Sequence, residues 1–198
     1  MAKIDLNQIQ DLRNRTGVGM MDCRKALEES DGDMEKAVEI LRKKGAATAE
    51  KRAGNSTSQG LVHAYIHPGA KVGVLVEVNC ETDFVARTDG LKQFAADIAM
   101  HIAAMKPMCV RPEELDQGYV QKEKDIFKEQ LLASGKPANM VDKIIEGKLQ
   151  KLYNEVCLMG QPFVKNDKLT IDDLLKDLIA KMGEKITIRR FVRYEVGV

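Results

Sequence analysis

A run of alternating residues that breaks abruptly constrains the fold of this chain more than any other feature. From Lys71 to Val78, valine recurs at every second position, which is the pattern of a strand with one buried face. The alternation stops at Thr82, where an acidic residue, Asp83, and a large aromatic residue, Phe84, are adjacent. Because consecutive strand residues point to opposite faces, both cannot be core residues if the strand continues. We predict that the strand ends here and turns Asp83 and Phe84 outward. Taken alone, the segment favours Phe84 as a core residue at a strand-to-helix turn, and it is the rest of the chain that favours the outward orientation.

Strand and helix patterns are mixed through the chain from about residue 60 to residue 198. Residues 61–67 and 71–80 form a predicted hairpin around a Pro-Gly-Ala turn, and residues 186–196 alternate as a long closing strand that belongs in the same sheet. Apolar residues at helical spacing predict four helices, which cover residues 91–102, 120–133, 138–158 and 170–179. The predicted fold class is therefore α+β, with an antiparallel sheet packed against helices.

Residues 1–45 carry three short helical patterns. The first begins at a capping box formed by Asp5 and Gln8 and ends at Gly17, and the third ends before Gly45. Three helices of about ten residues make a small bundle with a marginal core. A unit of this kind suits a docking module better than an enzyme.

The next stretch, residues 46–59, is small and polar. We interpret it as a linker whose first half could extend a helix and whose second half, from Gly54 to Ser58, is flexible. The predicted organisation is thus a docking module at 1–45, a linker at 46–59 and an α+β core at 60–198.

Charge and composition argue against two large function classes. The 31 basic residues are balanced by 30 acidic ones, so no net field draws the protein to nucleic acid or to a membrane surface. Tryptophan is absent and aromatic residues make up only 5%, which leaves few platforms on which unpaired bases could stack. There is no signal-peptide stretch and no apolar run of the ~18 residues that a membrane span needs. Four dispersed cysteines are expected to be reduced, and we predict a cytoplasmic protein with no membrane and no direct nucleic-acid partner.

Residue types used in catalysis and metal binding do not gather into a recognisable set. His63 and His67 are four apart on a predicted strand, which separates them by ~13 Å and disfavours a joint metal site. His101 lies two positions from the apolar stripe of its helix and is expected to face solvent. Cys80 is conceivable as a thiol nucleophile, but no nearby His, Asn or Asp completes a cysteine-based signature, and no phosphate-binding loop is present. We predict no catalytic residues, no cofactor and no metal, in a protein that acts on another protein.

A basic cluster, Arg189, Arg190 and Arg193, occupies the closing strand. The favoured interpretation is exposed or salt-bridged strand residues that discourage aggregation at the edge of the sheet. Contact with a partner is the alternative.

Four separated segments span nearly the whole chain: Thr16–Leu27 (TGVGMMDCRKAL), Asn79–Arg87 (NCETDFVAR), Met159–Val164 (MGQPFV) and Ile186–Tyr194 (ITIRRFVRY). Together, and in this order, they resemble the elongation factor Ts family. The resemblance implies a nucleotide-exchange partner of the translational GTPase elongation factor Tu. It also implies an N-terminal module with three helices like the ubiquitin-associated domain, which agrees with the first 45 residues.

The chain departs from the family pattern in two respects. Arg24 stands where the family usually has lysine, so the charge is kept but a planar fork replaces a compact ammonium group. The chain is also short, with space for one core subdomain where long members carry two and an inserted coiled coil. Two copies together would present what one long chain does, so we expect a homodimer.

The resemblance assigns the exchange activity to four consecutive residues: Thr82, Asp83, Phe84 and Val85. In the family this segment reaches the G domain of elongation factor Tu and disturbs the Mg²⁺ site beneath bound GDP, with Phe84 acting as a wedge. Met20, Met21 and Arg24 of the N-terminal module would anchor on the same G domain. The alternatives are a ubiquitin-associated-like adaptor that binds proteins or peptides without exchange activity, and an enzyme that uses Cys80.

Overall fold

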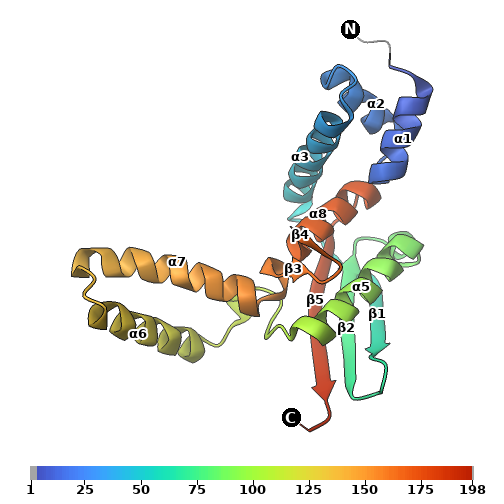
Figure 1. Ribbon diagram of the computed structural model, residues 1–198. Helices are drawn as coiled ribbons and strands as arrows, with labels where there is room; N and C mark the ends of the chain where they lie inside the picture. The colour runs from blue at the N-terminus through green and yellow to red at the C-terminus, as the bar shows by residue number, and fades with distance from the viewer. Residues whose placement is uncertain (1–3, 198) are drawn as a thin grey trace. The chain divides into compact units, whose positions relative to one another are not determined.

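The computed structural model describes residues 4–197, with the backbone alone at residues 138 and 139 (Figure 1). The helices are α1 (Leu6–Thr16), α2 (Met20–Glu29), α3 (Met34–Arg52), α4 (Asp83–Ala86), α5 (Asp89–Met105), α6 (Gln117–Ala133), α7 (Ala138–Val156) and α8 (Ile171–Met182), with 3₁₀ turns at Pro112–Glu114 and Leu158–Gly160. The strands are β1 (Gln59–Ile66), β2 (Val72–Cys80), β3 (Pro162–Phe163), β4 (Asn166–Thr170) and β5 (Ile186–Glu195). This mixture confirms the predicted α+β class.

The chain divides into two compact units, and each combines segments that are distant in sequence. The first comprises residues through Val62, Val78–Ala95 and Asp173–Thr187, and the second comprises His63–Glu77, Ala96–Asp172 and the residues from Ile188 onward. Over the described residues, no helix is both long enough and apolar enough to span a bilayer.

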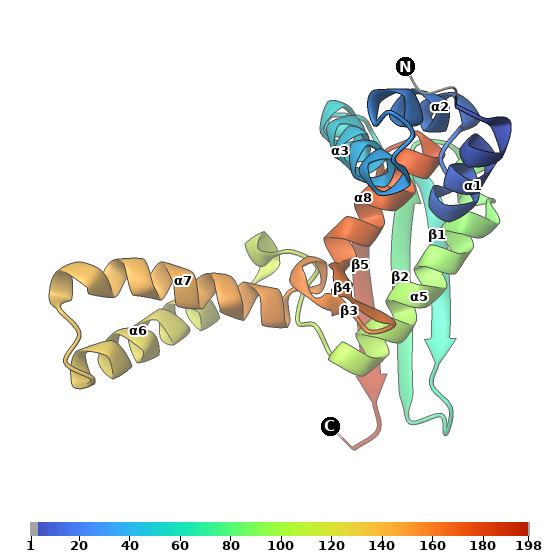
Figure 2. The ribbon, with the colours of Figure 1, turned by 45° about the horizontal axis from the view of Figure 1, so that its top comes forward.

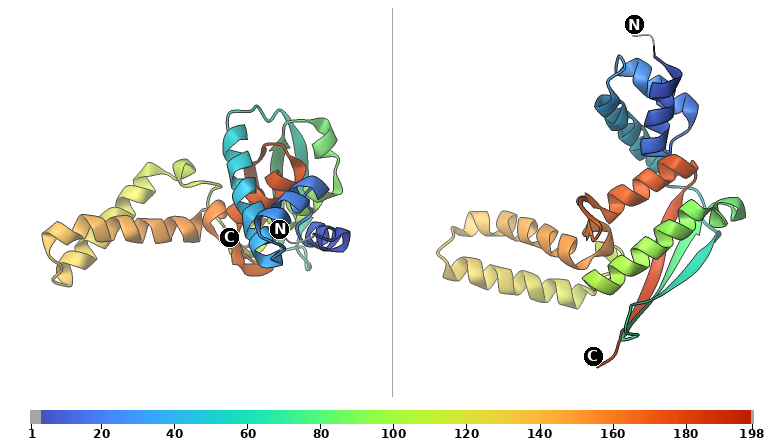
Figure 3. Two further views of the ribbon diagram at one scale, coloured as in Figure 1. Left: turned by 90° about the horizontal axis from the view of Figure 1, so that it is seen from above. Right: turned by 45° about the vertical axis from the view of Figure 1, so that its right-hand side comes forward.

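The main sheet has three strands in the order β1-β2-β5, so the closing strand lies beside the hairpin as predicted. The β1–β2 turn is closed by a 2.9 Å hydrogen bond from Ala70 N–H to His67 O. Alternate residues of β2, namely Val74, Val76 and Val78, are buried, and Figure 3 shows α5 running along one face of this sheet. The alternating valines therefore form the core-facing side of the central strand.

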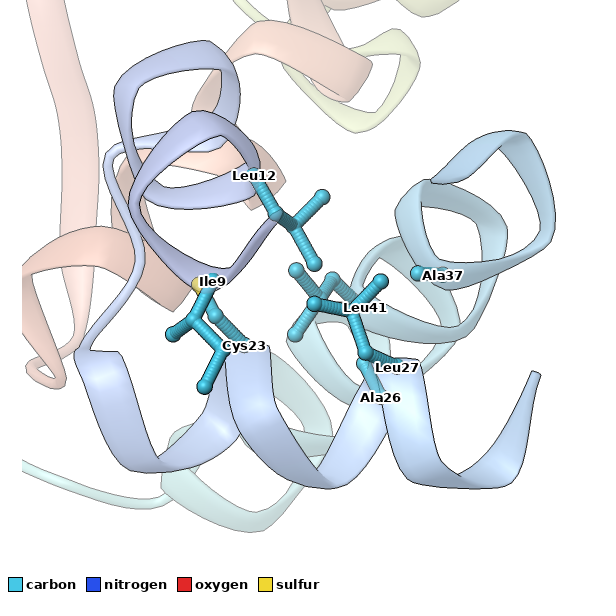
Figure 4. Packing of buried hydrophobic residues seen from close by; sticks show 7 residues of the cluster. All are labelled: Ile9, Leu12, Cys23, Ala26, Leu27, Ala37 and Leu41. Atoms are coloured by element: carbon cyan, nitrogen blue, oxygen red, sulfur yellow. The ribbon is translucent and has the colours of Figure 1, made fainter. Parts of the chain in front are cut away.

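Helices α1, α2 and α3 enclose a core of their own, which Figure 4 shows from close by. Its buried members are Ile9, Leu12, Cys23, Ala26, Leu27, Ala37 and Leu41. The predicted capping box at the start of α1 is confirmed, because Asp5 N–H donates to Gln8 Oε1 at 3.1 Å. Gly17, with a φ of +70°, ends α1 in the left-handed conformation that glycine adopts easily.

The third helix does not stop before Gly45, where its apolar pattern predicted its end. It continues through Arg52, so the first half of the 46–59 stretch extends a helix, as the sequence allowed. The residues after Gly45 are mostly alanine, glutamate, lysine and arginine, all strong helix formers. Gly45 itself serves close packing, because a Cβ at this position would lie 2.7 Å from Ala180 Cβ on α8.

The environment of His101 also corrects the sequence analysis. The side chain was expected in solvent, but it is fully buried. Its Nδ1 accepts a hydrogen bond from Val164 N–H at 3.2 Å, and its Nε2 lies 3.0 Å from Gln161 Oε1. The β3–β4 hairpin, which the sequence did not reveal, brings Phe163 next to the imidazole ring. Burial lowers the pKa of His101, so the neutral form is the one that fits.

Helices α6 and α7 form an antiparallel pair (Figure 2). Both were predicted, although α7 ends at Val156 and a 3₁₀ turn follows. At the base of the pair, Met108 N–H donates to Val156 O at 2.8 Å and Leu158 N–H donates to Cys109 O at 3.0 Å. The Cys109 and Cys157 sulfurs lie 3.5 Å apart as free, buried thiols. Burial raises the pKa of Cys109 to about 12, so this thiol is uncharged at neutral pH. The base of the helix pair is therefore closed by backbone hydrogen bonds and by side chains that carry no charge.

Candidate functional site

The segment predicted to turn outward forms a single helical turn, α4, directly after the central strand. Thr82 precedes it as the N-cap, and its Oγ1 accepts a hydrogen bond from Val85 N–H at 3.4 Å. Phe84 is 81% exposed, so the outward orientation is confirmed and the core alternative is wrong. Asp83 is half-exposed and pairs with Arg87 one turn later, at 2.9 Å.

The four residues of the Thr82–Val85 segment do not share one orientation. Val85 is only 8% exposed and belongs to the core. Thr82 is partly buried, and both its amide and its hydroxyl are engaged inside the protein. The side chains that reach solvent are therefore Asp83 and Phe84, while Thr82 and Val85 fix the turn that carries them.

Two carboxylates that the sequence analysis missed hold this segment in place. Glu184, just before β5, accepts hydrogen bonds from Thr82 N–H at 3.1 Å and from Thr82 Oγ1–H at 2.6 Å. Glu81 accepts from Lys185 N–H at 2.5 Å and from the Arg52 guanidinium at 2.9 Å. The Lys185 amide and then the Arg52 side chain lower the pKa of Glu81, so its carboxylate is charged at neutral pH. The only sequence feature that pointed toward these contacts was the predicted closing strand, which was expected to join the sheet of the hairpin.

Cys80 has no catalytic environment. The side chain is fully buried, and its thiol donates to Thr82 O at 3.1 Å. Burial raises its pKa, which disfavours the thiolate that a nucleophile requires. Over residues 4–197, no three His, Cys, Asp or Glu side chains gather as a metal site would need.

The second set of predicted contact residues lies on α2. Met21 is 64% exposed, whereas Met20 packs partly against the core of the three helices. Arg24 is exposed and pairs with Glu28 at 2.8 Å. Of the three predicted contact residues, Met21 and Arg24 therefore face solvent, and Met20 mainly supports the helix.

In the basic cluster on β5, Arg189 and Arg190 are exposed and Arg193 is partly buried. Arg190 pairs with Glu77 at 2.7 Å, and Arg193 pairs with Glu195 at 2.7 Å and donates to Ala103 O. These contacts agree with the favoured interpretation of salt-bridged strand residues.

Comparison with known proteins gives consistent matches over nearly the whole chain. The family model described as Elongation factor TS matches residues 22–198. The chain is 58% identical over 194 residues to Elongation factor Ts of Carboxydothermus hydrogenoformans, covering 98% of this chain and 89% of the relative. It is 53% identical over 197 residues to Elongation factor Ts of Desulforamulus reducens, covering 100% and 91%. It is also 53% identical over 195 residues to Elongation factor Ts of Fervidobacterium nodosum, covering 98% and 99%.

Proposed function

The chain belongs to the elongation factor Ts family, and from this premise we propose that it promotes release of GDP from elongation factor Tu so that GTP can bind. The observation that carries the proposal is Phe84, a large apolar side chain that is 81% exposed on a turn fixed from both sides. Exposed aromatic side chains on a rigid backbone are typical anchors of protein–protein contacts. Such a contact would be made in the cytoplasm, where translation elongation takes place.

The proposed mechanism acts through the Mg²⁺ ion of the partner. Phe84 wedges between partner side chains, with the Asp83 carboxylate beside it, and shifts the backbone that supports the metal. Mg²⁺ requires near-ideal octahedral geometry with ligands at about 2.0–2.1 Å, so a small displacement weakens its binding. Loss of the ion removes the charge that holds the diphosphate of GDP.

Linkage then completes the cycle. If the factor weakens GDP binding about a thousandfold, which is about 4 kcal/mol, GDP must weaken binding of the factor equally. Incoming nucleotide therefore expels the factor, which is free to act again. Exposed Met21 and Arg24 on α2 supply a second contact that keeps the factor on the G domain while Phe84 acts.

A homodimer is part of the proposal, and an apolar surface in the second compact unit supports it. Four apolar residues are exposed on the sheet or directly after it, and we refer to them as the apolar sheet patch: Ile66, Leu75, Tyr194 and Val196. Three of them line one shallow pocket. Leu75 alternates with the buried valines, so it points away from the core. Exposed apolar side chains on a sheet are typical of an interaction surface, and a second copy offers a matching one.

Release of fluorescent GDP from elongation factor Tu tests the proposal. An exchange factor accelerates release, and excess Mg²⁺ slows the accelerated reaction. An adaptor built on the three N-terminal helices would bind without changing the rate of release. Binding measured in parallel therefore separates the two functions.

A further inference from the structure

Two glutamates brace the Thr82–Val85 segment in a reciprocal manner. Glu184 accepts hydrogen bonds from the Thr82 amide at 3.1 Å and from its hydroxyl at 2.6 Å. In the opposite direction, Glu81 accepts from the amide of Lys185 at 2.5 Å. Each carboxylate thus binds the backbone amide of the residue that follows the other carboxylate. We call Glu81 and Glu184 the carboxylate brace.

The brace also includes the end of α3. Arg52 donates from Nη1 to both Glu81 carboxylate oxygens, at 2.9 and 3.1 Å. Lys185 Nζ donates to Ala53 O at 2.5 Å and to Asn55 O at 2.8 Å. Charge-assisted hydrogen bonds, which are stronger than neutral ones, therefore join three segments of the chain. One segment follows α3, one follows β2 and one precedes β5.

The turn α4 depends on such support because it is too short to be stable alone. A helix of four residues does not offset its nucleation cost. Thr82 Oγ1 donates to Glu184 and accepts from Val85 N–H, so the carboxylate acts on the turn through the N-cap. Val85 is anchored in the core on the other side. Phe84 lies between these two fixed points.

We propose that Glu184, supported by Glu81, is a positioning residue for nucleotide exchange that holds Phe84 in the orientation required by the partner. This inference rests on the proposed function. Without the brace, Phe84 would become ordered only on contact with the partner. The entropic cost of ordering it would then raise the free-energy barrier of the exchange step. Initial binding through α2 would be affected much less, because Met21 and Arg24 lie outside the brace.

The first test measures GDP release as a function of factor concentration. We expect Glu184→Ala to lower the maximal rate by about tenfold or more, with a half-saturating concentration within about twofold of wild type. Glu184→Gln should recover part of the rate, since its amide oxygen still accepts a hydrogen bond from Thr82. Glu146→Ala removes an exposed carboxylate from α7 and serves as the matched control.

The double variant shows whether Glu184 acts through Phe84. In a Phe84→Ala background, Glu184→Ala should lower the rate no further, because the positioned side chain is already missing. Equal effects in the two backgrounds would overturn the proposal. A change confined to the half-saturating concentration would overturn it as well.

A second measurement on the protein alone separates this inference from the proposed function. Amide hydrogen exchange of residues 85–88 should be clearly faster in Glu184→Ala, while the melting temperature changes little. Unchanged protection of these amides against hydrogen exchange would contradict the brace, whatever the rate of GDP release. If wild type fails to accelerate GDP release, the proposed function is wrong and the protection data still test the brace. Should Glu184→Ala fail to fold, Glu184→Gln and Thr82→Val carry the same comparisons.

Discussion

Phe84 and Val85 are consecutive residues on one helical turn, yet one is 81% exposed and the other 8%. Truncating an exposed side chain removes few contacts, so Phe84→Ala should change the free energy of unfolding by less than about 0.5 kcal/mol. Val85→Ala deletes buried methyl groups and should cost about 1–3 kcal/mol. Urea unfolding followed by circular dichroism measures both. A loss of several kcal/mol for Phe84→Ala would show that the side chain is a core residue in solution.

His101 gives the protein a titratable group in its interior. Burial lowers its pKa below the ordinary 6.5, and Nδ1 accepts a hydrogen bond that a protonated ring cannot accept. The stability it contributes is therefore present above pH 6.5 and is lost as the pH falls through the lower pKa of the folded state. We expect the free energy of unfolding to decrease as the pH falls below about 6.5. His101→Leu should be less stable at neutral pH and show a shallower decrease, and an equally steep decrease would contradict the assignment to His101.

At the scale of the elements, α2 has a core face and an exposed face, which is the proposed contact surface. Leu27 is fully buried among the three N-terminal helices, so Leu27→Ala should cost about 2–5 kcal/mol. Met21→Ala, on the exposed side, should leave the melting temperature unchanged and weaken binding to elongation factor Tu. Thermal unfolding and a binding titration distinguish the two variants. Unaltered affinity in Met21→Ala would remove this side chain from the proposed contact.

Local patterns predicted most of the elements, because each amphipathic strand or helix shows its buried face in its own sequence. The hairpin, the closing strand and helices α1, α2, α5 and α6 follow directly from such periodicity. The features that were missed depend on distant contacts. Gly45 marks close packing against α8 and not a helix end, and His101 is covered by a hairpin some 60 residues away.

Within the candidate site, the sequence predicted the exposed residues but not the contacts that hold them. The change from alternation to an acid–aromatic pair located Asp83 and Phe84, since their exposure follows from the local sequence. The brace joins residues that are distant in sequence: Glu184 lies 102 positions from Thr82, and Lys185 lies 104 positions from Glu81. No local pattern therefore reveals it. The family resemblance does not distinguish the inward residues Thr82 and Val85 from the outward ones.

For the whole molecule, the apolar sheet patch predicts a two-fold dimer. Light scattering at micromolar concentration should report about twice the 22.1 kDa chain mass. Tyr194→Asp should give the monomer mass, because it places a charge in the patch, whereas Leu132→Asp on the exposed side of α6 should not. Reductant should have no effect, since all four cysteines are buried. A wild-type monomer, or equal dissociation by both variants, would contradict this assembly.

The central claim, that Phe84 promotes GDP release from elongation factor Tu, is tested most directly by stopped-flow turnover. The GTPase loaded with fluorescent GDP is kept in large excess over the factor and is chased with unlabelled GTP. We predict that wild type releases many equivalents of GDP at a rate raised about a thousandfold, and that Phe84→Ala loses roughly 30-fold of this rate, which corresponds to about 2 kcal/mol. Release by Phe84→Ala at the wild-type rate would contradict the claim.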